Sequence, residues 1–152
     1  MIPTAEHFDL VVIGGGPGGY AAALYCTAAG LNVAIVERDK VGGTCLHRGC
    51  IPAKEFLETA AVFRTVAHAA TFGVQTTAPQ IDFAVSQARK QTVVDNLWKG
   101  LSGLLKKKKI TVINGTGTLH HGNLVKVSDG SEVKGTNVIL AAGSVPRTIP
   151  GF

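Results

Sequence analysis

Two cysteines, Cys45 and Cys50, stand five residues apart in the segment "GGTCLHRGCIPAK", residues 42–54. A regular helix separates residues at this spacing by about 7.5 Å along its axis, and an extended strand separates them by more. A disulfide needs Cα atoms within about 7 Å of each other, so a bridge between the two requires an irregular turn. The three glycines of the segment give the backbone that freedom. We therefore expect a glycine-rich loop that could carry a bond meant to open and close.

The residues around Cys50 favour a thiolate, the reactive form of cysteine. Pro52 is suited to the first turn of a helix, and Arg48 and Lys54 are close in sequence. A helix N-terminus and nearby cations both stabilise a negative sulfur. A close cysteine pair of this kind is typical of catalytic, redox-sensing or metal-binding sites.

Two other interpretations of the pair stay open. The thiols could be buried and unreactive, or they could bind zinc together with His47. The only other clustered histidines, His120 and His121, lack zinc-finger spacing, and no metal site is predicted. The third cysteine, Cys26, is expected to be a packing residue on a helix.

A second motif, "GGGPGG" at residues 14–19, fits G-x-G-x-x-G through Gly14, Gly16 and Gly19. Glycines there allow a tight turn, backbone approach to a pyrophosphate and close packing of helix on strand. Glu37, eighteen residues after Gly19, could accept hydrogen bonds from a ribose diol and would repel a 2′-phosphate. The motif predicts dinucleotide binding but leaves FAD and NAD as alternatives.

The elements that must position these residues are those of an α/β fold. Residues 8–13 and 31–37 read as buried parallel strands, joined by a helix that closes on Gly30. Helices are expected over residues 52–70 and over residues 82–107, the second with Asp82 as its N-cap and with Gly100 and Gly103 as sites of a kink.

Residues 110–144 read as five short segments, which we interpret as a β-meander that returns to a buried strand at residues 138–141.

The composition describes one folded domain: 152 residues, 45% hydrophobic and 16% charged. No apolar run is long enough for a membrane span, and no signal peptide is recognised, so we expect a cytoplasmic protein. The net charge of +5 includes the run Lys106–Lys109, which suits a helix C-terminus. Without a nucleic-acid reader motif, neither nucleic acid nor membrane is predicted as a partner.

Four segments together resemble the N-terminal part of the flavoprotein disulfide reductases, the class I pyridine nucleotide-disulfide oxidoreductases. They are "GGGPGGYAAALYCTAAGLNVAIVE", "VGGTCLHRGCIPAK", "GLLKKKKITVINGTGTL" and "VILAAGSVPRTIPG". The resemblance covers essentially the whole chain, and it is greatest to the dihydrolipoamide dehydrogenase branch. It implies an incomplete, three-layer, Rossmann-like FAD-binding domain over residues 1–147, and a linker over residues 148–152 toward an NAD-binding domain. It also implies exposed apolar surface where the family's returning FAD segment packs.

The resemblance also assigns roles to residues. Gly14, Gly16 and Gly19 would hold the FAD pyrophosphate, and Glu37 the adenosine ribose. Gly117 would contact the adenine. The residues implied beside the flavin are Gly43, Thr44, Cys45, Lys54, Ala142, Gly143 and Ser144. Cys45 is similar to the interchange thiol of the family, and Cys50 to the thiol that exchanges electrons with the flavin.

The implied reaction converts dihydrolipoamide and NAD⁺ to lipoamide and NADH in a full-length homodimer. Its substrate would be the dihydrolipoyl group of a carrier domain in 2-oxo-acid dehydrogenase complexes. A glutathione or mercuric reductase, an FAD-binding redox module without turnover, and an NAD-binding protein with an incidental cysteine pair remain as alternatives. Departures from the family pattern are Leu46-His47-Arg48 between the cysteines, Ala53 for serine and Ala142 for threonine.

Overall fold

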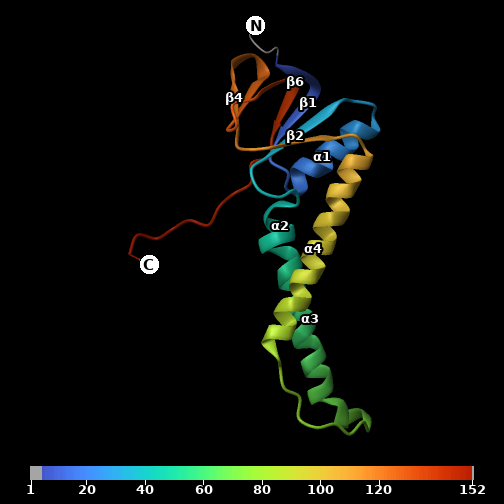
Figure 1. Cartoon of the computed structure of the whole chain (residues 1–152). Coiled ribbons are helices and arrows are strands. Elements are labelled where there is room, and N and C mark those ends of the chain that lie inside the picture. The colour runs from blue at the N-terminus through green and yellow to red at the C-terminus, as the bar shows by residue number, and fades with distance from the viewer. Residues whose placement is uncertain (1–4, 152) are drawn as a thin grey trace. The chain divides into compact units, whose positions relative to one another are not determined.

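The computed structural model describes residues 5–151 (Figure 1). The chain divides into two compact units. The first contains the residues up to Gly43 together with those from Gly100 onward, and the second is Thr44–Lys99. Each unit is described by itself. No helix within residues 5–151 is long and apolar enough to cross a membrane.

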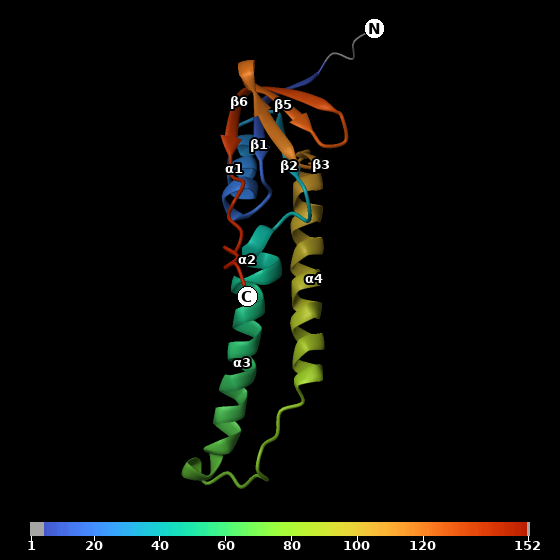
Figure 2. The same ribbon diagram turned by 90° about the vertical axis from the view of Figure 1, so that its left-hand side faces the viewer.

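The first unit is built on a six-stranded sheet with the order β3-β2-β1-β6-β5-β4. Strand β1 pairs in parallel with β2 and β6, β2 pairs in parallel with β3, and β4, β5 and β6 form an antiparallel set. Figure 2 shows β1 beside β6, with α1 behind them. The strands are β1 (Glu6–Ile13), β2 (Val33–Glu37), β3 (Thr111–Asn114), β4 (Gly117–His120), β5 (Leu124–Val127) and β6 (Glu132–Leu140). The predicted α/β class with a parallel sheet is confirmed.

Helix α1 (Pro17–Ala28) connects β1 to β2, as the sequence predicts. Its only buried residues are Gly19 and Ala23, whose small size lets the helix lie close to the sheet. The strands on either side supply the larger core side chains, among them Phe8, Val11 and Val36. Burial of such apolar surface contributes most of the stability of a domain.

The predicted five-segment meander is wrong in two respects. Strand β3 pairs in parallel with β2, so only β4, β5 and β6 form the meander. Strand β6 is continuous through Thr136 and Asn137, where the prediction separates two of its five segments. Its register with β1 extends from Val133 to Leu140, and this long parallel pairing overrides the local turn preference.

The end of β6 is less buried than predicted. Val138 and Ile139 are only half-buried, and Leu140 is 65% exposed. The reason lies in the pairing of β5 with β6, which stops at Lys134 and leaves the end of β6 beyond its antiparallel neighbour. The predicted strand is therefore present over residues 138–140, but the expectation that it is buried is wrong.

The second unit is helical. It contains most of α2 (Gly43–Arg48), all of α3 (Cys50–Ala67), the 3₁₀ turn η1 (Ala69–Phe72) and the first part of α4 (Phe83–Lys107). Figure 1 shows α3 and α4 joined by η1 and a following segment without regular structure. Inside the unit the Phe56 and Phe83 rings stack with centroids 5.5 Å apart, and Arg89 forms an ion pair with Glu55.

The ends of these helices differ little from those predicted. Helix α3 begins two residues earlier than expected and ends three residues earlier, with η1 and the left-handed Gly73 (φ 79°) completing the segment. Asp82 is the predicted N-cap of α4, because the Val85 N–H donates to its Oδ1 atom at 3.2 Å. Helix α4 is continuous through Gly100 and Gly103.

Candidate functional site

The carboxyl ends of four parallel strands meet at one edge of the sheet. Hydrogen bonds continue the ladder beyond the strand ends: the Gly115 N–H donates to the Glu37 carbonyl and the Ala141 N–H to the Ile13 carbonyl, each at 2.8 Å. The segments that follow β1, β2, β3 and β6 are therefore held side by side. Ligands of open α/β sheets bind at this edge.

A cavity of about 100 Å³ lies at the same edge. It brings together four of the residues assigned to cofactor binding from the sequence: Gly14, Glu37, Gly117 and Ala142. Small-molecule pockets are usually larger than about 300 Å³, so this cavity suits one part of a dinucleotide rather than the whole. Its lining consists of Ile13, Gly14, Val36, Glu37, Arg38, Gly115, Thr116, Gly117 and Ala142.

Glu37 connects this cavity to the glycine turn. Its Oε2 atom accepts a hydrogen bond from the Gly15 N–H at 2.6 Å, and its Oε1 atom accepts one from the Asp39 N–H at 2.9 Å. Bonds of this type to a carboxylate are stronger than neutral ones. Each oxygen keeps a further lone pair, so the carboxylate fixes the turn and still has capacity to accept a ligand hydroxyl.

The structure gives a different reason for glycine at each of the three motif positions. Gly14 has φ +104°, and a Cβ atom there would lie 2.7 Å from the Ala141 carbonyl carbon. A Cβ on Gly19 would overlap the Gly14 carbonyl oxygen. Both positions need glycine for the fold itself.

Gly16 is different, because the protein leaves room for a side chain there. Its φ of −72° is accessible to any residue, and the nearest atom to an added Cβ is the Gly43 Cα at 3.8 Å. Because the fold itself does not require glycine at this position, its absent side chain indicates that a phosphate of a ligand approaches the backbone at this point. The N-terminus of α1, which begins at Pro17, adds the N–H groups and partial positive charge that favour phosphate.

The chain returns to this turn at the start of the cysteine segment. The Gly42 N–H donates to the Gly15 carbonyl at 2.8 Å. Gly43 has φ +58°, and a Cβ there would lie 2.7 Å from the Gly16 Cα. The two turns are therefore packed backbone to backbone, and Cys45 follows two residues later in the sequence.

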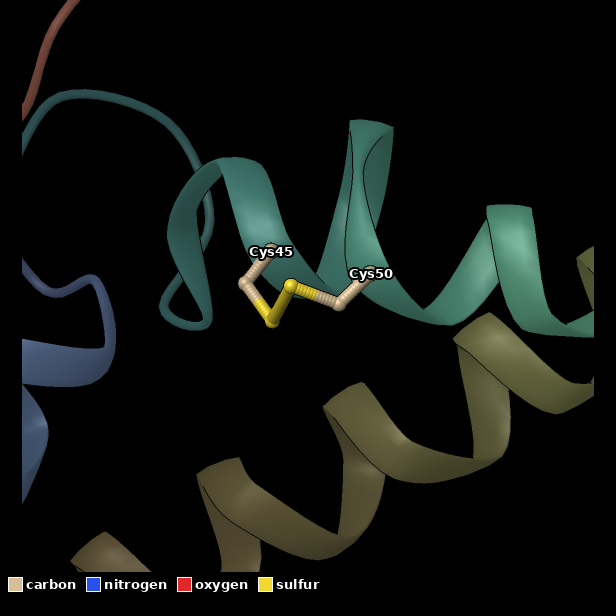
Figure 3. The surroundings of a disulfide bond; sticks show 2 residues. All are labelled: Cys45 and Cys50. Atoms are coloured by element: carbon tan, nitrogen blue, oxygen red, sulfur yellow. A yellow bond between two sulfur atoms is a disulfide. The ribbon is translucent and has the colours of Figure 1, made fainter.

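Cys45 and Cys50 form a disulfide, with their Cα atoms 4.6 Å apart (Figure 3). Cys45 lies in α2, and Cys50 is the first residue of α3. The predicted irregular loop is wrong in form, because the pair lies on two helices separated by a single residue. That residue, Gly49, has the non-helical angles φ −132° and ψ −104°, and this break brings together two residues that one continuous helix would keep apart.

The surroundings of the disulfide suit a thiolate at Cys50. Cys50 is exposed and Cys45 is half-buried. Lys54, also exposed, is four residues after Cys50 in α3 and so lies on the same helix face. Pro52 is the third residue of α3 rather than the first. Cys26, the free cysteine, is half-buried on α1, in agreement with a packing role.

Some predicted residues are not brought to the cavity. Gly143 and Ser144 follow Ala142 in exposed chain without regular structure and do not line it. Thr44, Cys45 and Lys54 belong to the second unit. Arg38 and Thr116 also line the cavity, but they were not predicted from the sequence. Their positions one and two residues after the ends of the parallel strands β2 and β3 are the signal that could have identified them.

Comparison with known proteins agrees with these features. Residues 8–152 match the model of the pyridine nucleotide-disulphide oxidoreductases. The chain belongs to this family. Among curated relatives of the family, the dihydrolipoyl dehydrogenase of Chlamydia muridarum is 45% identical over 96% of the chain and 32% of the relative. The dihydrolipoyl dehydrogenase of Bacillus subtilis is 43% identical over 97% of the chain and 34% of the relative. The chain spans about a third of the length of these relatives.

Proposed function

We propose that this chain is the FAD-binding and disulfide-bearing part of an oxidoreductase that oxidises dihydrolipoyl groups and passes the electrons to NAD⁺. The observation that carries the proposal is the packing of Gly42 and Gly43 on the nucleotide turn at Gly15 and Gly16. This packing ties the start of the redox segment to the dinucleotide motif. The names of the relatives, dihydrolipoyl dehydrogenase, support this substrate class.

The residues of the first unit fit one end of FAD. The backbone at Gly14, Gly16 and Gly19 would hold the pyrophosphate at the N-terminus of α1. The Glu37 carboxylate would accept hydrogen bonds from the ribose diol, and Gly117 would leave space for the adenine. When bound, FAD accepts two electrons and delivers a hydride to NAD⁺.

A second group of residues would lie on the flavin side of the cofactor. Cys50 would face the flavin, and Lys54 would lie near its reactive edge. Lys54, one turn after Cys50 in α3, and the N-terminus of α3 would give this region a positive character, which stabilises a thiolate at Cys50. The remaining residues proposed on the flavin side are Gly43, Thr44, Cys45, Ala142, Gly143 and Ser144.

The chemistry of the chain itself is thiol–disulfide exchange. One thiolate of the substrate attacks Cys45 Sγ, the bond between the two cysteine sulfurs breaks, and Cys50 leaves as a thiolate. The second substrate thiolate then attacks the substrate sulfur of the mixed disulfide and releases Cys45. The substrate gains an internal disulfide and loses two protons, and the Cys45–Cys50 pair gains two electrons.

The rest of the proposal follows the family pattern. Residues 1–147 would form part of the FAD-binding domain and residues 148–152 a linker to the NAD-binding domain. The complete protein would be a cytoplasmic homodimer that serves the lipoyl carrier domain of a 2-oxo-acid dehydrogenase complex. A glutathione or mercuric reductase is the second candidate. The sequence Leu46-His47-Arg48 between the cysteines favours the first.

Substrate preference in the complete protein tests this function. With NAD⁺ as acceptor, kcat/KM for dihydrolipoamide should exceed that for reduced glutathione by at least about a hundredfold, because the two thiols of one dihydrolipoamide resolve the mixed disulfide intramolecularly. The reverse assay uses glutathione disulfide and mercuric ion with NADH and with NADPH. Faster turnover of either than of lipoamide would contradict the proposed substrate.

A further inference from the structure

We propose that the reduced cysteine pair also acts without a bound cofactor, as a reductant of low-molecular-weight disulfides, with Cys50 as the attacking thiolate and Cys45 as the resolving thiol. This inference rests on the proposed function only in taking Cys45 and Cys50 as a redox pair. It reverses the order of use assigned to the two sulfurs in the flavin-dependent cycle, where an external thiol meets Cys45 first.

Accessibility is the first argument for Cys50. Thiol–disulfide exchange requires a thiolate that a second molecule can approach. Cys50 is exposed, whereas Cys45 is half-buried and is followed by Leu46, which is only 8% exposed. An external disulfide therefore reaches Cys50 more easily than Cys45.

Ionisation is the second argument, and it favours the same residue. Cys50 is the first residue of the 18-residue helix α3, so a negative sulfur there lies at the positive end of the helix dipole. The N–H groups of Cys50 and Ile51 have no carbonyl acceptor within their own helix. The helical hydrogen bonds begin with the Ala53 N–H, which donates to the Gly49 carbonyl. Lys54, one turn later, adds a cation.

The support for a thiolate at Cys45 is weaker. Cys45 lies in the first turn of α2, but this helix has only six residues, so its dipole is smaller than that of the 18-residue α3. A stabilised thiolate is intrinsically less nucleophilic, but this loss is smaller than the gain in thiolate population, because the Brønsted coefficient for exchange is only about 0.4–0.5.

The spacing of the pair allows the reaction to finish within the chain. The Cys50 thiolate attacks one sulfur of a small disulfide, forms a mixed disulfide and releases one thiolate. Cys45, with its Cα 4.6 Å from that of Cys50, then attacks Cys50 Sγ and releases the second thiolate. The Cys45–Cys50 bond forms again, the pair loses two electrons, and the external disulfide gains two electrons and takes up two protons.

The flavin-loaded protein should expose a different sulfur to external molecules. The proposed function places Cys50 against the flavin, where a bound cofactor would cover it and leave Cys45 as the thiol open to substrate. Cofactor occupancy would then determine which sulfur reacts with external molecules.

The direct test is competitive alkylation of the 152-residue chain after reduction and removal of FAD. A substoichiometric pulse of iodoacetamide is followed by peptide mass spectrometry, with the half-buried Cys26 as an internal standard. We expect Cys50 to be alkylated at least about tenfold faster than Cys45 and Cys26. Equal rates at Cys45 and Cys50, or faster reaction of Cys45, would overturn the proposal.

Trapping with glutathione disulfide provides a second measurement. In a Cys26→Ser background, the reduced Cys45→Ser variant should retain a stable mixed disulfide with glutathione, and the reduced Cys50→Ser variant should form one at least about tenfold more slowly. The reverse order would reject the assignment of roles. Both tests use cofactor-free chain, so a failure to bind FAD would defeat the proposed function and leave this result unaffected.

Discussion

Replacement of Gly16 by alanine should leave the chain folded and weaken FAD binding by about tenfold to a hundredfold. The protein has room for the new methyl group, since its nearest neighbour would be the Gly43 Cα at 3.8 Å, and the backbone angles of Gly16 suit alanine. A pyrophosphate approaching the turn has no such room, and a steric overlap of this kind costs about 1–3 kcal/mol. The measurements are an FAD fluorescence titration and a thermal melt of the same sample.

Two neighbouring glycines provide matched controls for this variant. Gly18 has no atom within 4 Å of an added Cβ, so Gly18→Ala should change neither the melt nor the FAD affinity by much. Gly14→Ala should destabilise the fold itself for two reasons. The new Cβ would overlap the Ala141 backbone, and the positive φ of Gly14 disfavours any residue with a side chain. If Gly16→Ala binds FAD as tightly as Gly18→Ala does, the glycine turn is not the pyrophosphate site.

The second large effect is expected for the disulfide. In the complete protein, Cys45→Ser and Cys50→Ser should each lower the rate of dihydrolipoamide oxidation by on the order of 10³-fold or more, because loss of either sulfur removes the disulfide that the substrate thiolate attacks, and no other residue replaces it. Cys26→Ser is the matched control and should keep full activity. Each variant should retain its bound flavin, which separates the loss of chemistry from a loss of cofactor.

Thiol counting gives an independent reading of the same variants. Reduction of the unaltered chain should reveal two additional thiols, and neither Cys45→Ser nor Cys50→Ser should show that gain. Substantial dihydrolipoamide oxidation by either serine variant would contradict the assigned exchange reaction.

The sequence predicted the elements whose signals are local. The apolar runs of β1 and β2 and the glycine turn between them are found as expected. Asp82 is the N-cap of α4, because its side chain accepts a hydrogen bond from a backbone N–H in the first turn of the helix. In each case the residue types themselves determine the local structure.

One missed feature depends on a partner far away in the sequence. Thr136 and Asn137 favour a turn in isolation, but the ladder with β1 keeps them extended. The helical form of the cysteine segment was missed for a local reason: it depends on a break at one residue, Gly49, which no periodicity reveals.

The candidate site shows the same division between local and distant signals. The motif residues Gly14 and Glu37 were identified from their spacing alone. Two other features of the site could be known only from the strand order of the sheet. They are the hydrogen bond from the Gly15 N–H to Glu37 and the position of Thr116 in the same cavity as Gly14 and Glu37. Motif spacing identifies which residues belong to the site, whereas the pairing of the strands determines which of their atoms come into contact.

The most direct test of the account is a binding comparison on the 152-residue chain between FAD and NAD⁺. Each dinucleotide is titrated separately, with flavin fluorescence followed for FAD and equilibrium dialysis for both. We expect one FAD per chain and markedly weaker binding of NAD⁺, with the FAD affinity reduced in Gly16→Ala and retained in Gly18→Ala. Saturable binding of NAD⁺ without binding of FAD would contradict the assignment of this chain as a flavin-binding redox unit.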